Sequence, residues 1–430
     1  MKKTKTLLAL LLALTLALAC GLTAFAVAPP SSDVGGKCGS GIDECEGPVI
    51  QVGITKKLEM PDGTVVPAAT FKFDVTGVAG ESTGTPPAVS QASITFANGD
   101  ESAADAQGFR RTSDGTVTTV TREAADVFGG VAWTTTGKFA YDIKEVDATY
   151  TTITANEAMV YSTVVTYRVN VYVKQCAECG EYYIDAVGAY KLIKEDGGPG
   201  TPDEKGKATP DPDTWTVEHD FSDIEFTNKY MKRTDPDGTD PDTLSISKTT
   251  TGDYRDENEY FNFTLALDLP DLIAATFPGP YPVYVYEGAS DKTSDEFDAG
   301  NIPATFTAAG PNTFKLKHGQ TLKIGGLPIG TEYTISEVTP TNYEPSGVIT
   351  SGGTEADTGD EDEGQTLIFE DQLVKGGGAN LAAYTNFRDM IPDGLNINDL
   401  PFFAMIAIAL AAAVILVAAK ARKAKKSYSL

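Results

Sequence analysis

Two segments of the chain repeat one ordered series of short apolar alternations. Alternating apolar residues are typical of half-buried strands, and here Gly, Pro and Asp clusters separate the runs. Examples are Phe71-Lys72-Phe73 in the first segment and Phe261-Asn262-Phe263 in the second. A long helical period is almost absent between the two ends, although a brief helix is predicted near Arg122–Phe128. The pattern predicts an all-β protein of two tandem β-sandwiches.

The repeat includes a Lys in an early run, a Glu in a later run and an Asn near the end of each copy. These residues are Lys56, Glu145 and Asn228 in the first copy, and Lys248, Glu337 and Asn386 in the second. In both copies 89 residues separate the Lys from the Glu, whereas the Glu and Asn are 83 and 49 residues apart. The first copy therefore carries extra material late in its domain.

Strand alternation places these polar side chains on the same face as apolar neighbours. Ile54 shares a face with Lys56, and Ile143 shares one with Glu145. Separate charges facing a core are costly, so for any single residue a snorkelling Lys or a carboxylate at the rim is the simpler alternative. The ordered recurrence of all three residue types favours a joint role. Lys57 competes with Lys56, which is preferred because it aligns with Lys248 through the preceding Ile and Thr or Ser.

The repeat and the composition suggest the domain boundaries. We expect a Cys-containing N-terminal segment at 27–48, a first sandwich at 49–232 and a second at 243–390. Residues 233–242, rich in Asp, Pro, Gly and Thr, are predicted to be a solvated linker. Their aspartates lack the spacing and distal Glu of an EF-hand, so a calcium site is the less favoured alternative.

The layout resembles the streptococcal T-antigen major pilins and related Gram-positive surface proteins with isopeptide-linkage domains. The most similar stretches are 318–337 and 137–145, and the resemblance covers about residues 49–390. It implies Ig-like sandwiches in which a Lys on the first strand joins an Asn on the last strand, beside a Glu or Asp. The implied cross-links are Lys56 to Asn228 and Lys248 to Asn386, with Glu145 and Glu337 as the catalytic acids.

The chemistry of such a bond explains why these residue types are needed. Burial lowers the pKa of a Lys and raises that of a Glu, so the amine can be neutral and nucleophilic. A protonated Glu can polarise the Asn carbonyl and pass a proton to the departing ammonia. The reaction occurs once and modifies the protein itself. We therefore expect a protein that is not an enzyme and that needs no cofactor.

The N-terminus, 1–26, is predicted to be a secretory signal peptide. Three Lys precede the apolar stretch Leu7–Ala19, and Ala24-Phe25-Ala26 has the form of a cleavage site. A lipoprotein signal that uses Cys20 is the less favoured alternative.

The C-terminus, 391–430, is predicted to be a sorting signal and anchor. Phe402–Ala419 is apolar and uncharged, and five basic residues follow it, which predicts a transmembrane helix with an outward-facing ectodomain. Ile391-Pro392-Asp393-Gly394 resembles a sortase motif, although Asp393 stands where that motif has Thr. Sortase processing and simple membrane anchoring are both retained, with sortase favoured.

Four cysteines remain after the predicted signal peptide. Cys38 and Cys45 lie in the N-terminal segment, whereas Cys176 and Cys179 lie between two strand-like runs, at a predicted hairpin tip. Secretion permits disulfides, which could be two local bonds or cross-pairs that attach the N-terminal segment to the hairpin. A four-Cys zinc site is less favoured because C-x2-C occurs only once, so no metal is predicted.

Charge limits the classes of partner. Residues 27–399 hold 26 basic and 60 acidic residues, a net charge of −34, which excludes a nucleic-acid binder held by phosphate contacts. We predict a secreted, wall- or membrane-anchored structural protein, either a pilus or fimbrial subunit or a stalk. Its expected partners are sortase and neighbouring pilin subunits or peptidoglycan. A surface adhesin for a host or matrix ligand is the alternative. The Lys that would join subunits stays unassigned, because 169–174 only faintly resembles a pilin motif.

Overall fold

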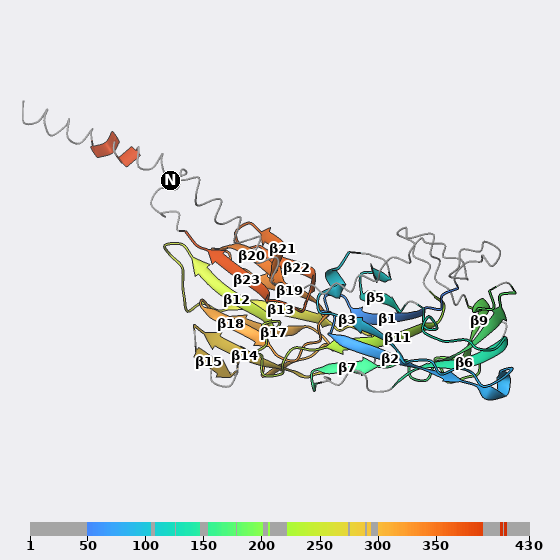
Figure 1. The fold of residues 1–430 in the computed structure, drawn as a ribbon. Helices are drawn as coiled ribbons and strands as arrows, with labels where there is room; N and C mark the ends of the chain where they lie inside the picture. Colours follow the sequence, from blue (N-terminus) through green and yellow to red (C-terminus); the bar gives the residue numbers. More distant parts are fainter. Residues whose placement is uncertain are drawn as a thin grey trace, which may run out of the picture.

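The computed structural model describes residues 50–389, apart from 105–107, 125, 147–153, 178, 201–204, 207–221, 274–275, 289 and 294–299, together with 405–406 and 408–410. Its sheets form two sandwiches, so the predicted all-β class is confirmed (Figure 1). The predicted signal peptide, the segment 27–48 and the sorting motif 391–394 lie outside the described residues.

The first sandwich packs two sheets around one apolar core. One sheet has the order β4 (Phe109–Ser113), β5 (Val117–Ala124), β1 (Ile54–Pro61), β11 (Glu225–Lys232) and β7 (Glu157–Val160). The facing sheet has the order β10 (Lys205–Gly206), β9 (Tyr182–Ile193), β8 (Thr166–Gln175), β6 (Gly137–Glu145), β2 (Ala69–Gly77) and β3 (Ala92–Phe96). Two short 3-10 turns also belong to this sandwich: η2 (Ala79–Glu81) lies between β2 and β3, and η3 (Asp100–Ser102) lies between β3 and β4.

The second sandwich has the same plan around a core of its own. One sheet has the order β15 (Ser290–Thr293), β14 (Tyr281–Glu287), β18 (Gln320–Ile324), β12 (Leu244–Thr251), β23 (Asn380–Phe387), β20 (Glu344–Ser351) and β21 (Thr354–Asp360), and β16 (Thr305–Phe306) pairs with β14. The facing sheet has the order β17 (Asn312–Leu316), β13 (Phe261–Asp268), β19 (Glu332–Val338) and β22 (Thr366–Leu373).

In each sandwich the first and last of these strands lie side by side and parallel. β1 pairs with β11, and β12 pairs with β23. The alternation in the sequence sets which side chains face inward: in β13 Phe261, Phe263, Leu265 and Leu267 are buried and the residues between them are more exposed. Burying each such side chain contributes about 1.5–3 kcal/mol. The buried side chains of the two sheets form the core, and the first and last strands lie next to each other inside one of these sheets.

The helix predicted near Arg122–Phe128 is wrong. Arg122 lies in β5, where it is opposite Lys56 of β1, and its guanidinium pairs with Asp100 at 2.9 Å. Residues 127–130 form turns. Pairing along the whole of β1 overrides the weak local preference for a helix.

The segment 233–242 is packed at the junction of the sandwiches, which differs from the solvated linker that its composition predicts. Thr234 and Asp242 are buried, and the Asp242 carboxylate accepts a hydrogen bond from the Gly378 N–H at 2.9 Å. The turn at 237–242 uses its own aspartates as acceptors. Among the described residues, no group of three or more His, Cys, Asp or Glu is arranged to hold a metal ion.

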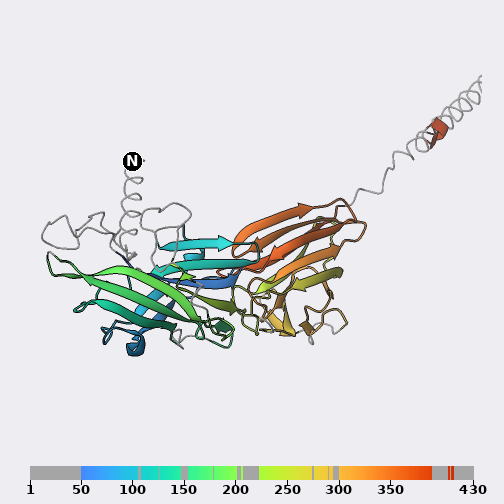
Figure 2. The same cartoon turned by 90° about the vertical axis from the view of Figure 1, so that its right-hand side faces the viewer.

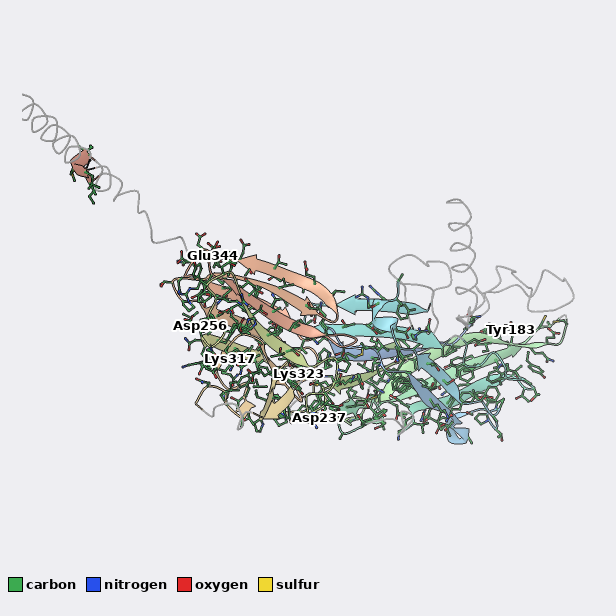
Figure 3. All side chains as sticks on the ribbon, turned by 90° about the vertical axis from the view of Figure 1, so that its left-hand side faces the viewer. Tyr183, Asp237, Asp256, Lys317, Lys323 and Glu344 are labelled. Carbon is green, nitrogen blue, oxygen red and sulfur yellow. The ribbon has the colours of Figure 1, made fainter. Side chains whose placement is uncertain are left out.

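The two sandwiches lie end to end (Figure 2). Figure 3 shows Tyr183 of the first sandwich near one end and Glu344 of the second near the other. At the junction the Gly376 N–H donates to the Gly63 carbonyl at 2.9 Å, and the Ile329 N–H donates to the Lys232 carbonyl at 2.8 Å. Backbone hydrogen bonds thus connect the two sandwiches directly.

Gly330 is predicted to be essential to the junction. Its φ is +88°, and a Cβ there would lie 2.4 Å from Cβ of Pro61 in the first sandwich. Gly319 offers a matched control, because its φ is +77° but nothing lies within 4 Å of its Cβ position. Both alanine substitutions add backbone strain of about 1–2 kcal/mol. We expect Gly330→Ala to lower the thermal unfolding midpoint clearly more than Gly319→Ala, and equal shifts would contradict the tight junction.

Candidate functional site

Each sandwich buries one Lys, one Glu and one Asn at its centre. In the first sandwich Lys56 is on β1 and Asn228 is on β11, two positions beyond Phe226, the residue opposite Lys56. Both side chains therefore point to the same face. Glu145 is at the end of β6 in the facing sheet, opposite Phe73. The carboxylate thus approaches the Lys and the Asn from across the core.

The three side chains of the first site are in direct contact. Lys56 Nζ lies 3.0 Å from Glu145 Oε2, and Asn228 Nδ2 donates to Glu145 Oε1 at 2.8 Å. All three residues are 0% exposed. The ammonium also lies 4.7 Å from the centre of the Phe71 ring. One carboxylate therefore bridges the amine and the amide.

The second site repeats this geometry. Lys248 Nζ lies 2.8 Å from Glu337 Oε1 and 3.0 Å from Oε2, and Asn386 Nδ2 donates to Oε1 at 2.6 Å. Asn386 again stands two positions beyond the residue opposite the Lys, here Tyr384, and Glu337 is opposite Phe263. The two triads are equivalent in register as well as in residue type.

Burial sets the electrostatics of both sites. Desolvation lowers the pKa of Lys56 and of Lys248 from 10.5 to about 8, against the opposing effect of the neighbouring carboxylate. Desolvation also raises the pKa of Glu337, against the effects of Lys248 and Asn386. These shifts bring the neutral amine and the neutral acid closer in free energy to the ion pair.

The two sites differ in how the Asn carbonyl is held. Asn228 Oδ1 accepts a hydrogen bond from the Ser162 backbone N–H at 2.8 Å. Asn386 Oδ1 is buried and has no donor in the part of the chain that the structure describes. Sequence reasoning missed Ser162, because a backbone donor between β7 and β8 leaves no side-chain signal in the sequence.

Burial distinguishes the lysines of the two sites from the competing Lys57 and from lysines that snorkel to solvent. Lys57, the competitor of Lys56, is about one-third exposed and pairs with Glu225 at 2.5 Å on the outside of the sheet. Lys56 and Lys248 have fully buried side chains, so neither snorkels to solvent. The alternation that distinguishes Lys56 from Lys57 thus points them to opposite faces of β1.

Cys176 and Cys179 lie at the tip of the β8–β9 hairpin, as expected. Both are disulfide-bonded, so neither provides a thiolate for the zinc alternative. Cys38 and Cys45 lie outside the described residues, and the pairing of the four cysteines stays a prediction. Lys174, in the segment that faintly resembles a pilin motif, is exposed and pairs with Asp185 at 2.8 Å.

Most of the predicted span Phe402–Ala419 lies outside the described residues, although 405–406 and 408–410 are helical. Within the described part of the chain, no helix has the length and apolar character needed to span a membrane.

Comparison with known proteins gives two sequence matches. Residues 242–369 match the model of a domain of unknown function, DUF7601. A stretch of 149 residues is 30% identical to the pilus tip adhesin Cpa of Streptococcus pyogenes, and it covers 35% of this chain. About a third of this chain is therefore similar in sequence to part of a streptococcal pilus protein. The matched stretch amounts to only 17% of the length of that relative.

Solved structures from the same group of proteins also match. The major pilin of Streptococcus pyogenes is 16% identical with a TM-score of 0.32, and the match covers 80% of this chain and all of that one. The T-13 major pilin is 18% identical with a TM-score of 0.28, and the match covers 79% of this chain and 98% of that one. The matched proteins are a pilus adhesin and major pilins.

Proposed function

We propose that each buried Lys, Glu and Asn forms a Lys–Asn isopeptide bond without any other catalyst, and that the chain is a structural subunit of a surface pilus. The observation that carries the proposal is the recurrence of one buried triad in both sandwiches, with the Lys and Asn on neighbouring first and last strands. A lone buried ion pair is weak evidence for any role. Two equivalent triads, each with an amide beside the amine, have the composition that amide exchange requires.

In this reaction the neutral Lys amine attacks Cγ of the Asn. The new C–N bond forms as the bond from Cγ to Nδ2 breaks, and the Asn side-chain nitrogen leaves as ammonia. Of the two amine protons, one stays on the new amide and the other reaches the leaving nitrogen through the Glu. The carboxyl is suited to this transfer because it contacts both Nζ and Nδ2. The Glu ends the reaction in the protonation state in which it began.

The bond would join the first strand of each sandwich to the last. It would close loops of about 170 residues in the first sandwich and about 140 in the second, worth about 5 kcal/mol each by analogy with disulfide loop entropy. A pulling force applied through the ends of a sandwich would then pass along β1 and β11, or β12 and β23, without separating the sheets. This resistance suits a stalk that is under tension at a cell surface.

The rate of bond formation should have a plateau near neutral pH and fall on both sides. The reactive pair of neutral Lys248 and protonated Glu337 carries one proton, as does the ion pair, so their ratio does not change with pH between the two pKa values. Above about pH 8, the pKa of Lys248, the pair loses this proton and the rate should fall about tenfold per pH unit. At low pH, below the raised pKa of Glu337, Lys248 is an unreactive ammonium.

This pH profile can be measured on chain refolded from denaturant, quenched at timed intervals and digested. The amount of the Lys248–Asn386 cross-linked peptide gives the rate at each pH. A rate that keeps rising up to pH 10 would contradict the profile, because it would mean that the neutral amine alone limits the reaction and that Glu337 supplies no proton.

The proposed surface role is supported by the match to a pilus tip adhesin and by the two ends of the sequence. In a pilus, sortase would cleave near Asp393 and join the chain to neighbouring subunits or to peptidoglycan. The test is a cell-wall extract of the source bacterium, probed with an antibody against residues 50–389. A pilus subunit gives covalent ladders of high mass that disappear in a strain without sortase.

An adhesin is the second candidate, because the relative with the 30% identical stretch is itself described as an adhesin. An adhesin that is not polymerised gives a single band of wall-attached monomer in the same extract. It would also bind a defined host or matrix ligand. A single band would therefore overturn the subunit role. It would not bear on the isopeptide bonds, which are tested separately by mass.

A further inference from the structure

The backbone N–H of Ser162 is aimed at a reacting group of the first site. It donates to Asn228 Oδ1 at 2.8 Å, while Nδ2 of the same amide donates to Glu145. The two hydrogen bonds fix which end of the amide faces the carboxyl. Oδ1 is the atom on which negative charge develops when an amine attacks Cγ, and an N–H that already donates to that atom can stabilise the charge as it forms.

The local fold explains why this N–H is available. β7 pairs with β11 as far as Val160 and Lys229, and continued pairing would set Tyr161 opposite Asn228. The chain instead leaves the sheet after Val160, so the Ser162 N–H lies beside the Asn228 side chain. The end of an edge strand thus turns a backbone donor toward the core.

The second site lacks this donor because the corresponding strand stays in its sheet. There β20 remains paired with β23 past Asn386, and Ser346, the position that corresponds to Ser162, lies in the ladder opposite Thr385. Asn386 Oδ1 has no hydrogen-bond partner in the described part of the chain. The molecule therefore contains a natural comparison between a triad with a backbone donor and a triad without one.

We propose that the Ser162 N–H is a catalytic oxyanion donor for the Lys56–Asn228 bond, an inference that rests on the proposed function. As Lys56 Nζ bonds to Asn228 Cγ, the carbonyl electron pair moves onto Oδ1 and the Ser162 N–H stabilises it. The pair returns to re-form the C=O bond as Nδ2 departs with the proton that Glu145 delivers, and ammonia leaves. Glu145 is then required only for proton transfer, and the oxyanion at the second site forms without such a backbone donor.

The experiment replaces the N–H and leaves the side chain intact. Incorporation of the α-hydroxy acid analogue of Ser162 turns the donor into an ester oxygen, and Ser162→Pro is a second variant that removes it. Ser162→Ala is the matched control, because it keeps the N–H. The full ectodomain is refolded from denaturant, quenched at timed intervals and digested, and the cross-linked peptides of both sites are quantified in the same sample.

Loss of one oxyanion donor typically slows catalysis about 100-fold or more. We expect the ester and Pro variants to form the Lys56–Asn228 bond about 100-fold more slowly, with the Lys248–Asn386 bond unchanged and Ser162→Ala like wild type. Fluorescence of Trp133, which packs against the core of the first sandwich, reports whether that sandwich has folded. A folded ester variant that forms the first bond at the wild-type rate overturns the role of Ser162. If neither bond forms in the wild-type chain, it is the proposed function that fails.

Discussion

Replacing Glu337 by alanine should leave the Lys248–Asn386 bond unformed while the bond in the first sandwich still forms. The mass of the variant, corrected for the substitution, would then exceed that of the wild-type chain by one molecule of ammonia, because Asn386 keeps its side-chain amide. The free energy of unfolding of the second sandwich should fall by about 5 kcal/mol from the lost cross-link. Lys248 would also lose its buried partner, which adds to the cost. We expect the thermal midpoint to fall by about 10–20 °C, measured by calorimetry.

Glu344→Ala is the control for this variant. Glu344 is exposed at the start of β20, as Figure 3 shows, and its substitution should change neither the mass nor the midpoint beyond the loss of its own atoms. A Glu337→Ala chain that still lacks two ammonia molecules would contradict the role of Glu337 as the acid. A Glu337→Ala chain that has lost no ammonia, although its first triad is intact, would show that the two sites do not react independently.

Replacing Lys56 by methionine should abolish the first bond, whereas the same change at the neighbouring Lys57 should not. Methionine keeps an unbranched chain at the buried position and removes the nucleophile. The mass of Lys56→Met, corrected for the substitution, should therefore exceed that of the wild-type chain by one molecule of ammonia. The free energy of unfolding of its first sandwich should fall by about 5 kcal/mol. Lys57 is partly exposed and pairs with Glu225, so Lys57→Met should change stability by less than about 1 kcal/mol.

Peptide mapping of these two variants gives the most direct assignment of the nucleophile. The Lys56–Asn228 cross-linked peptide should be present in Lys57→Met and absent from Lys56→Met. A Lys57–Asn228 cross-linked peptide that is present in Lys56→Met and absent from Lys57→Met would mean that β1 forms with a register one residue different, since such a slip exchanges the two faces of a strand.

Strand alternation was sufficient to predict the all-β class and the inward faces, as in Phe261–Leu267 of β13. The repeat was sufficient to choose Lys56 over Lys57, because the two copies share one register. In each sandwich one equivalent Glu then meets the Lys and the Asn from the facing sheet. Local pattern and tertiary geometry agree here because the side-chain period of a strand is two.

Three features could not be read from local pattern. The helix expected near Arg122 yields to the β1–β5 ladder, which is a tertiary effect. The polar segment 233–242 packs at the junction because both sandwiches supply hydrogen-bond partners that its composition does not show. The Ser162 donor depends on where β7 leaves the sheet, and a backbone group has no residue type to identify it.

The central claim, that both buried triads react, is tested most directly by the intact mass of the recombinant ectodomain with its cysteine state accounted for. The account predicts a mass that is lower than the sequence mass by two molecules of ammonia, with cross-linked peptides that join Lys56 to Asn228 and Lys248 to Asn386. A folded chain with the full sequence mass would contradict it.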